Sequence, residues 1–302
     1  MSSGALVVGE ALIDEVVDSG RVSRYPGGSP ANVALGLGRL NISTRLHTAI
    51  GADADGSVIR EHLAASGVTL TPESVTDAPT SRASATLAAD GSATYEFALQ
   101  WDPRRIDDLG APTVIHAGSL GIFLEPGAEV TREILLRGRA AGALITLDPN
   151  VRSTILPSQR RAQELFESLV FRSDLTKLSD EDAAYLFPGK SLGYVLDLLI
   201  DGGVAVAAIT RGSQGALLAS GPHRVEIAPV TTRVADTVGA GDTFMATLIW
   251  ALILESVGWN GQTIATSRLE QIGGIAARAA AITVGRPGAD LPYRSELEPS
   301  NV

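Results

Sequence analysis

A run of small residues that leads into an apolar segment is the feature of this sequence with the clearest chemical potential. Gly239 and Gly241 flank Ala240, and Asp242 follows just before an apolar stretch that starts at Phe244. If that stretch is a helix, the backbone N–H groups of the loop lie at its N-terminus, where the helix dipole favours anions. Asp242 then either acts as a base beside an anion site or serves only as an N-cap.

A second glycine-rich segment precedes a helical pattern near the N-terminus. Gly27 and Gly28 are followed by Pro30, which is favoured in the first turn of a helix, and by Asn32. Paired glycines let a ligand approach the backbone, and an Asn amide offers a donor and an acceptor that suit a sugar hydroxyl. Taken by itself, however, the segment fits a plain strand-to-helix turn with a surface Asn better than a binding site.

Several familiar motifs are absent. The chain has no G-x-x-x-x-G-K-S/T phosphate loop, and no G-x-G-x-x-G follows the first predicted strand, where Gly9 and Glu10 stand instead. A P-loop kinase is therefore excluded, and a dinucleotide-binding Rossmann site is disfavoured. The chain has no cysteine, which excludes disulfides and Cys-ligated metals, and its four His residues lack metal-ligand spacing.

Composition limits the possible partners. The 302 residues are 45% hydrophobic and 19% charged, with a formal net charge of −10. An acidic balance argues against a broad nucleic-acid surface, which needs clustered Lys and Arg. The N-terminus has no basic and apolar leader, and the longest apolar run, residues 244–254, is too short to cross a bilayer and is predicted to be a buried helix. We expect no nucleic-acid or membrane partner and a cytoplasmic location.

The elements that must position these residues alternate between strand and helix patterns. Short runs rich in β-branched residues or Leu predict strands at residues 5–8, 113–116, 143–147, 175–178 and 204–210. Helical spacing lies between them, at residues 30–40, 58–66, 129–141, 160–168 and 191–199. Strands that alternate with helices predict an α/β fold with a parallel sheet covered on both faces.

Two segments break this alternation. Residues 12–25 look extended, with a turn at Asp18, Ser19 and Gly20, and residues 82–100 hold two alternating runs joined at Asp90 and Gly91. Asp-Gly between alternating runs is a strong hairpin signal. Both segments can form a small second sheet, which would be a candidate lid because lids exclude water during phosphoryl transfer. Residues 1–302 then form a single domain that carries this lid.

Together the two glycine-rich segments resemble the signatures of the ribokinase or PfkB-like carbohydrate kinase family. These are an early Gly-Gly-x-x-x-Asn, at residues 27–32, and a late Asp-Thr-x-Gly-Ala-Gly-Asp, at residues 236–242. Similar motifs stand between and after them: Gly-x-Asp-x-x-Gly at 51–56, Asp-Pro-Asn-x-Arg at 148–152, an acidic motif at 177–182, Thr-x-Gly-x-x-Gly at 210–215 and Arg-Pro-Gly-Ala at 286–289. The resemblance implies a ribokinase-like fold, a doubly wound, mostly parallel sheet with a small β-sheet lid.

The resemblance also implies a reaction, the transfer of the γ-phosphoryl group of ATP to a sugar hydroxyl. Asp242 would remove the hydroxyl proton, and the N–H groups of Gly239, Ala240 and Gly241 would stabilise charge on the transferring group. Such a division of labour suits phosphoryl transfer, which depends mostly on positioning and charge stabilisation. Removing Asp242 should therefore reduce turnover far more than sugar binding.

Binding residues follow from the same resemblance. Asp14 would accept hydrogen bonds from sugar hydroxyls, or is only a surface charge of the lid. Arg152 would contact a sugar oxygen, or only holds the Asp-Pro-Asn turn. The full set implied is Asp14, Gly28, Asn32 and Arg152 for the sugar, and Thr210, Gly212 and Gly215 for the nucleotide.

Cations are implied as well. Mg²⁺ is expected with ATP and is held largely by phosphates and waters. The acidic motif of the family usually ends in Glu, whereas the aligned residue here is Asp182, with Glu181 beside it. Asp182 is the candidate for a Mg²⁺-linked role in spite of this departure. Asp236 would help to hold a monovalent cation such as K⁺, or it caps its loop.

The choice of sugar rests on smaller similarities. Gly-Ser-Pro-Ala-Asn at 28–32 and Gly-Glu-Ala-Leu-Ile-Asp at 9–14 look more like fructokinases than ribokinases or adenosine kinases. Many fructokinases and 2-keto-3-deoxygluconate kinases carry a Tyr-Arg pair after the lid hairpin, where this chain has Leu99, Gln100 and Trp101. Losing that Arg weakens the case for an acidic sugar, because a carboxylate favours a charged clamp. Trp101 either stacks on a neutral sugar or covers lid packing.

We therefore predict a kinase that phosphorylates fructose at the 6-hydroxyl. The alternatives are another PfkB sugar kinase, such as a ribokinase or a 2-keto-3-deoxygluconate kinase, and a sugar-binding protein that kept the fold without catalysis. An oxidoreductase is remote, because the dinucleotide fingerprint is missing. Related kinases often pair through their lids, so a homodimer through the lid is also expected.

Overall fold

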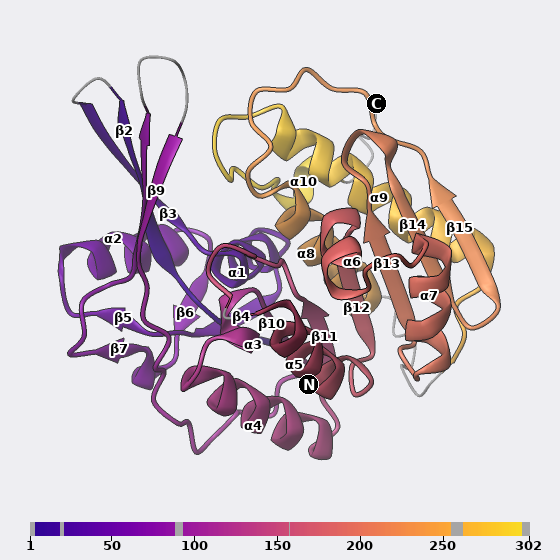
Figure 1. The fold of residues 1–302 in the computed structure, drawn as a ribbon, viewed down its shortest axis with the longest axis horizontal. Coiled ribbons are helices and arrows are strands. Elements are labelled where there is room, and N and C mark those ends of the chain that lie inside the picture. The colour runs from indigo at the N-terminus through magenta and orange to yellow at the C-terminus, as the bar shows by residue number, and fades with distance from the viewer. Residues whose placement is uncertain (1–3, 19–20, 88–92, 157, 255–261, 298–302) are drawn as a thin grey trace.

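The computed structural model describes residues 4–297 except 19–20, 88–92, 157 and 255–261. A nine-stranded sheet crosses the molecule, and a four-stranded sheet projects from one end of it (Figure 1). The order in the large sheet is β15-β14-β13-β12-β11-β10-β1-β4-β6. Its strands are β1 (Gly4–Val8), β4 (Ser43–His47), β6 (Val68–Leu70), β10 (Val114–Gly118), β11 (Leu144–Asp148), β12 (Leu175–Ser179), β13 (Val206–Thr210), β14 (Ala216–Ser220) and β15 (His223–Ile227).

The large sheet is parallel from β6 to β13, and β14 and β15 add an antiparallel edge. Strands such as β1 and β13 are apolar on both faces, as parallel strands tend to be when helices cover each side. In β1, Ala5 and Val7 belong to one buried cluster, whereas Leu6 and Val8 belong to the other. Because successive side chains of a strand point to opposite faces of the sheet, β1 contributes residues to both buried clusters.

Helices cover both faces of the sheet. The first cluster lies under α1 (Ser29–Arg39), α2 (Ala54–Ala64), α8 (Ala240–Leu254) and α9 (Thr266–Val284). The second lies under α3 (Leu120–Phe123), α4 (Gly127–Ala140), α5 (Gln159–Val170), α6 (Asp180–Leu186) and α7 (Leu192–Asp201). Apart from the lid, the other described elements are a short helix α10 (Arg294–Leu297), two 3₁₀ helices at Pro72–Ser74 and Gly212–Gln214, and a strand pair, β5 (Ile50–Gly51) with β7 (Val75–Thr76).

Two helices illustrate how sequence sets burial. In α5 the buried residues Ala162, Leu165, Phe166 and Leu169 are three or four positions apart, which makes one apolar stripe. In contrast, α8 is apolar around its whole circumference and packs against both α1 and α9. A helix that is apolar on every side must be enclosed, so α8 is the central helix of its layer.

The lid sheet has the order β3-β2-β8-β9. It consists of β2 (Leu12–Asp18), β3 (Arg21–Gly27), β8 (Arg82–Leu87) and β9 (Ala93–Ala98), with β2 and β8 paired in parallel at its centre. The small lid sheet of the predicted fold is therefore confirmed, whereas the single domain over residues 1–302 with a lid at about 12–25 and 82–100 stays a prediction. The turns predicted at Ser19 and Gly20 and at residues 89–92 lie outside the described residues.

The alternation of strands and helices predicted from sequence is confirmed, with element ends that differ by a few residues. The sequence reading did not identify β4, β6, the edge strands β14 and β15, or α9. The apolar run at 244–254 lies in the buried helix α8, as predicted. Among the described residues, no helix is both long and apolar enough to cross a membrane. The homodimer through the lid stays a prediction, and on that lid Val22 and Tyr25 are exposed.

Candidate active site

The candidate site residues lie along the carboxyl edge of the parallel strands. From β1, the strand order runs one way through β4 and β6 and the other way through β10 to β13. Such a reversal leaves a crevice outside the strand ends, the usual ligand site of open α/β sheets. Loops that follow β1, β11 and β13 carry Glu10, Arg152 and Gly212 to this edge. Of the predicted sugar residues, Asp14 lies on the lid strand β2, Gly28 and Asn32 lie at the start of α1, and Arg152 follows β11. Of the predicted nucleotide residues, Thr210 ends β13, and Gly212 and Gly215 follow it.

Asp242 is fixed at the start of α8 by two side chains of α1. Ser29 Oγ donates to its Oδ1 at 2.6 Å, and Asn32 Nδ2 donates to its Oδ2 at 2.7 Å. The carboxylate is buried, and this burial raises its pKa, although the bonds from Ser29 and Asn32 and the charges of Lys177 and Arg152 oppose the rise. A raised pKa brings a carboxylate closer to the range of an effective general base.

The loop before Asp242 forms a tight turn onto α8. Gly239 has φ 78°, a conformation that favours glycine, and its carbonyl accepts the first helical bond from the N–H of Thr243 at 2.8 Å. The N–H of Ala240 donates to the carbonyl of Thr237 at 3.3 Å. The first N–H groups of a helix have no partner within the helix, so the start of α8 is where backbone donors for an anion would be expected. The anion site at residues 239–241 stays a prediction, and the N–H of Ala240 is already donated to Thr237 in this structure.

The glycine pair before α1 serves close packing. A Cβ on Gly27 would lie 2.0 Å from Oδ2 of Asp14, so the absence of a side chain makes room for that carboxylate. Gly28 has φ 103°, and a Cβ there would lie 2.5 Å from the carbonyl oxygen of Glu10. These glycines bring the lid strand β2, the end of β1 and the start of α1 together around Asn32.

Three carboxylates share the field of one arginine. Arg152 lowers the pKa of Glu10, Asp14 and Asp242, although burial is the largest effect on each and raises it, to about 7 for Glu10. Glu10 Oε2 accepts the N–H of Gly121 at 3.1 Å. Sequence reasoning gave no role to Glu10 or to Ser29. The structure thus gathers the predicted residues Asp14, Gly28, Asn32, Arg152 and Asp242 in one neighbourhood.

A buried ion pair lies beside this group. Lys177 Nζ in β12 is 2.8 Å from Oδ2 of Asp148 at the end of β11, with side chains 4% and 0% exposed. Burial is the largest effect on Asp148 and raises its pKa to about 7; Lys177 opposes the rise, and Asp182 and Asp242 add to it. The pKa of Lys177 is raised by these carboxylates in spite of burial. The motif at residues 177–182 indicates only its acidic residues, and nothing in it predicts that Lys177 is buried beside Asp148.

The predicted nucleotide residues form an open turn after β13. Thr210 Oγ1 donates to the carbonyl of Leu178 at 3.4 Å, which ties the turn to β12. Gly212 is exposed with φ 51°, and a Cβ there would meet no atom within 4 Å. Gly215 has φ 81°, and its Cβ would lie 2.0 Å from the carbonyl oxygen of Ile227. Gly212 therefore faces open space, whereas Gly215 allows two backbones to pass closely.

The two residues predicted to bind cations, Asp182 and Asp236, accept hydrogen bonds from backbone N–H groups. Asp182 Oδ1 accepts the N–H of Val151 at 2.7 Å, and its Oδ2 accepts the N–H of Ser179 at 2.8 Å in a capping box at the start of α6. Asp236 accepts the N–H groups of Val238 and Gly288 at 3.0 and 2.9 Å. Each oxygen keeps a second lone pair, so either carboxylate fits a cation as one ligand, directly or through water. No cluster of three or more His, Cys, Asp or Glu suited to a metal occurs in the described part of the chain.

Trp101 lies in the core instead of the lid or the crevice. It is 3% exposed and belongs to the buried cluster beneath α3 and α4. Its Nε1 donates to the carbonyl of Gly121 at 3.1 Å, and its own carbonyl accepts the N–H of Gly127 at 3.0 Å. Of its two predicted roles, stacking on a sugar is not supported in this structure. Trp101 does have a packing role, but it packs in the core of the main sheet and not in the lid.

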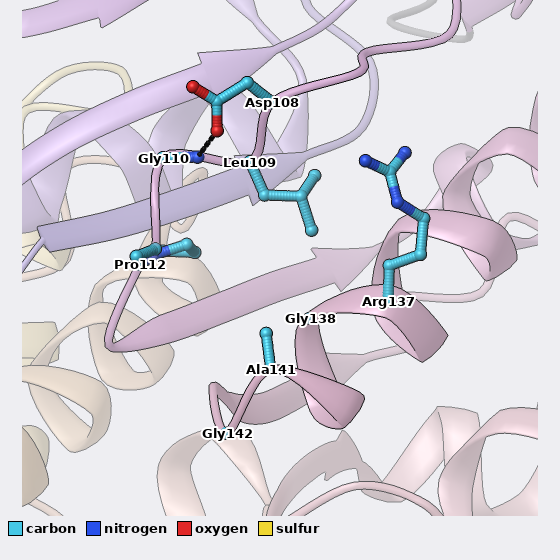
Figure 2. A pocket seen from close by; sticks show the side chains of 9 residues that line it. Asp108, Leu109, Gly110, Pro112, Arg137, Gly138, Ala141 and Gly142 are labelled. Atoms are coloured by element: carbon cyan, nitrogen blue, oxygen red, sulfur yellow. Dashed lines mark hydrogen bonds between the residues drawn. The ribbon is translucent and has the colours of Figure 1, made fainter.

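A separate hollow lies at the opposite edge of the sheet, near the start of β10 and β11. Figure 2 shows this pocket of about 330 Å³ between the loop at Asp108 and the end of α4 at Arg137. Asp108 Oδ1 accepts the N–H of Gly110 at 2.8 Å, and Arg137 donates to the carbonyls of Ile106 and Asp107. These polar groups hold the wall of the pocket together, so they do not converge on a ligand as a binding site requires.

Comparison with solved structures identifies the fold. The chain is similar to a fructokinase from Vibrio cholerae O395 with fructose, ADP and potassium bound, with a TM-score of 0.82 and 22% identity over 98% of this chain and 97% of that one. It is also similar to a putative ribokinase II from E. coli in complex with ATP and Mg²⁺, with a TM-score of 0.81 and 21% identity over 98% of this chain and 97% of that one. At these identities the likeness establishes a ribokinase-like fold.

Comparison with families and curated sequences goes further. The model of the pfkB family carbohydrate kinases matches residues 5–296. A fructokinase of Rhizobium leguminosarum bv. trifolii is 31% identical over 264 residues, which cover 83% of this chain and 80% of that protein. The chain therefore belongs to the pfkB family of carbohydrate kinases.

Proposed function

We propose that this protein is an ATP-dependent sugar kinase that phosphorylates a primary hydroxyl, and that its acceptor is fructose, which it converts to fructose 6-phosphate. The observation that carries the proposal is Asp242, a buried carboxylate held by Ser29 and Asn32 at the N-terminus of α8. A base that stands directly beside backbone anion donors suits the transfer of a phosphoryl group to a hydroxyl.

In this proposal Asp242 receives the proton of the attacking hydroxyl. Its two oxygens are oriented by one hydrogen bond each, so one lone pair per oxygen is available to a sugar hydroxyl. The N–H groups at 239–241 face the transferring phosphoryl group. Asp14, Gly28, Asn32 and Arg152 would hold the other sugar oxygens, because Asn32 contacts Asp242 and Arg152 acts on both Asp14 and Asp242.

The nucleotide extends along the carboxyl edge toward β13. Gly212 is exposed and leaves room for a phosphate or ribose, whereas Thr210 fixes the turn to β12. Mg²⁺ would neutralise the ATP phosphates and is held mostly by phosphate and water oxygens. Asp182 and Asp236 can each add one ligand, to Mg²⁺ and to a monovalent cation such as K⁺.

Charge in the pocket supports a neutral sugar. Glu10, Asp14 and Asp242 are carboxyl groups near Arg152, and Lys177 acts on Asp242 as well, so carboxyl groups outnumber cations there. Carboxylates accept hydrogen bonds from sugar hydroxyls, but they repel a second carboxylate on the substrate. This favours fructose over 2-keto-3-deoxygluconate. The Rhizobium relative is named a fructokinase, and the Vibrio structure holds fructose, which also supports the choice.

A coupled ADP-release assay tests the proposal. ATP and Mg²⁺ are supplied with fructose, ribose, 2-keto-3-deoxygluconate, adenosine or glucose, using the parent, Asp242→Asn, and the exposed control Asp201→Asn in α7. We expect fructose to give turnover in the parent and the control, and kcat to fall by about 10²–10⁴-fold in Asp242→Asn because the base is lost.

The outcomes separate the alternatives. Turnover with ribose or 2-keto-3-deoxygluconate alone would keep the kinase and change the sugar. Sugar binding without any ADP release would favour a sugar-binding protein of this fold. Near-normal kcat in Asp242→Asn would remove the proposed base whatever the sugar.

A further inference from the structure

The pair of Lys177 and Asp148 lies on the face of the sheet that α8 covers. Leu175, two positions from Lys177 on β12, belongs to the buried cluster under α1, α8 and α9. Because side chains alternate along a strand, Lys177 points to the same layer. Lys177 is one of only two lysines in the chain, the other being Lys190. The chain thus buries one of its lysines directly behind the candidate site.

The ammonium lies against the anion loop. A Cβ built on Gly241 would stand 3.1 Å from Lys177 Nζ, which is tighter than ordinary van der Waals contact. The missing side chain at Gly241 therefore lets the ammonium approach the first turn of α8. An ammonium has three N–H donors, more than one oxygen of Asp148 can occupy. The positive end of the helix and a full positive charge meet at this point.

Stability alone gives little reason for such an arrangement. Burying two charges costs desolvation that their attraction seldom exceeds, and apolar residues of similar volume often serve as well. Here one ammonium interacts with three carboxylates, Asp148, Asp182 and Asp242. The cluster carries excess negative charge, yet it adjoins donors suited to an anion. A cation at this place offsets the repulsion that the carboxylates would exert on an arriving phosphate.

We infer that Lys177 is a positioning residue for phosphoryl transfer: held by Asp148 and seated against Gly241, its ammonium supplies positive charge to the anion site at the start of α8. The inference rests on the proposed kinase function. In the step, the bond from the γ-phosphorus to the ADP oxygen breaks, a bond to the sugar oxygen forms, and the hydroxyl proton goes to Asp242. Lys177 keeps its protons throughout and lowers the energy of the negative charge that the transferring group carries.

A simpler role would make Lys177 only the counter-ion of Asp148. The two roles predict different activities for a variant in which both Lys177 and Asp148 are replaced by neutral residues. Lys177→Met alone leaves Asp148 buried without a cation, so stability falls under either role. In Lys177→Met/Asp148→Asn the carboxylate that Lys177 contacts directly is neutral, while Asp182 and Asp242 keep their own hydrogen-bond donors, so the melting temperature should recover toward that of the parent.

The test compares the parent, Lys177→Met, Lys177→Met/Asp148→Asn and Lys190→Met. Lys190 is the matched control, since it is exposed and lies over the ring of Tyr194 on α7. We expect the double variant to recover its melting temperature while kcat stays about 10²–10³-fold below the parent, the usual loss for one anion-stabilising group. KM for the sugar should change little, and Lys190→Met should behave as the parent. Recovery of both melting temperature and kcat in the double variant would overturn the inference.

A binding readout keeps this test separate from the proposed function. ADP, Mg²⁺ and aluminium fluoride mimic a planar transferring phosphoryl group, and they should raise the melting temperature of the parent and of Lys190→Met. The rise should be lost in the double variant, and an equal rise there would contradict the role of Lys177. If the parent releases no ADP with any sugar, the proposed function fails, and the aluminium fluoride experiment alone decides whether Lys177 serves an anion site.

Discussion

The two ends of the candidate site are built in different ways. At the sugar end, Asp242 is buried and each of its oxygens is oriented by a side chain of α1. At the nucleotide end, the exposed turn at Gly212 depends on backbone conformation, with φ 51° at that residue and φ 81° at Gly215. At the proposed sugar end, the geometry therefore depends on which side chains are present. At the proposed nucleotide end, it depends on backbone conformations that favour glycine. Substitutions at the two ends should affect different kinetic constants.

The largest expected effect is at the sugar end. Asn32→Ala removes the donor to Oδ2 of Asp242, and a lost hydrogen bond to a charged group costs about 1.5–3 kcal/mol, or roughly 10–150-fold in kcat/KM for the sugar. Because the lost bond stabilised the ionised form, the pKa of Asp242 should rise further. Activity requires the carboxylate, so the acid limb of the kcat/KM profile should move to higher pH. An unchanged acid limb would show that Asn32 does not tune this base.

Two glycine substitutions test the proposed nucleotide end, with Gly212→Ala as the control for Gly215→Ala. Gly215→Ala combines positive φ, which costs about 1–2 kcal/mol, with a Cβ that would stand 2.0 Å from the carbonyl oxygen of Ile227. Gly212→Ala carries only the backbone cost, because its Cβ would enter open space. We expect both to raise KM for ATP and leave KM for the sugar nearly unchanged, with the larger loss of thermal stability in Gly215→Ala. Equal effects on both substrates would contradict the division between the two ends.

The smallest expected effect is at Asp182, between the two ends. Asp182→Ala removes the acceptor for the N–H groups of Val151 and Ser179, so the capping box of α6 loses one of its two hydrogen bonds, and loss of a capping interaction costs about 0.5–2 kcal/mol of unfolding free energy. Because Val151 precedes Arg152, KM for the sugar should rise modestly. If Asp182 is also linked to Mg²⁺, the Mg²⁺ concentration that gives half-maximal turnover should increase. A change in melting temperature with no change in the Mg²⁺ dependence would leave Asp182 a structural residue.

Much of the fold follows from local patterns, and what was missed depends on distant contacts. Apolar runs such as residues 143–147 identify central strands because both faces are buried. β4 carries Arg45 and His47, which do not resemble a buried strand. Arg45 donates to the carbonyl of Leu109, and His47 Nδ1 lies 2.8 Å from Thr71 Oγ1. These partners are remote in sequence, so tertiary hydrogen bonding decides that β4 belongs in the sheet.

The site divides in a similar way. Asp242 and Asn32 can be predicted from spacing and resemblance, because each lies in a glycine-rich segment at the start of a helix. Ser29 was read only as part of such a motif. Lys177 did leave a signal, since a lysine in the middle of a short strand predicted to be buried requires a partner. Its partner Asp148 ends the neighbouring strand, but the pairing of β11 with β12 is needed to bring the two together.

The contacts of Asp242 also bear on how the protein is made. Ser29 and Asn32 meet that carboxylate across 213 and 210 positions of the chain. During synthesis, α1 leaves the ribosome long before α8, so the nascent chain holds Ser29 and Asn32 without the carboxylate that they contact. A released fragment that ends before α8 lacks the proposed base and cannot bury the inner face of α1. If Asp242 is the base, phosphorylation of sugar begins only once the chain has been translated past α8.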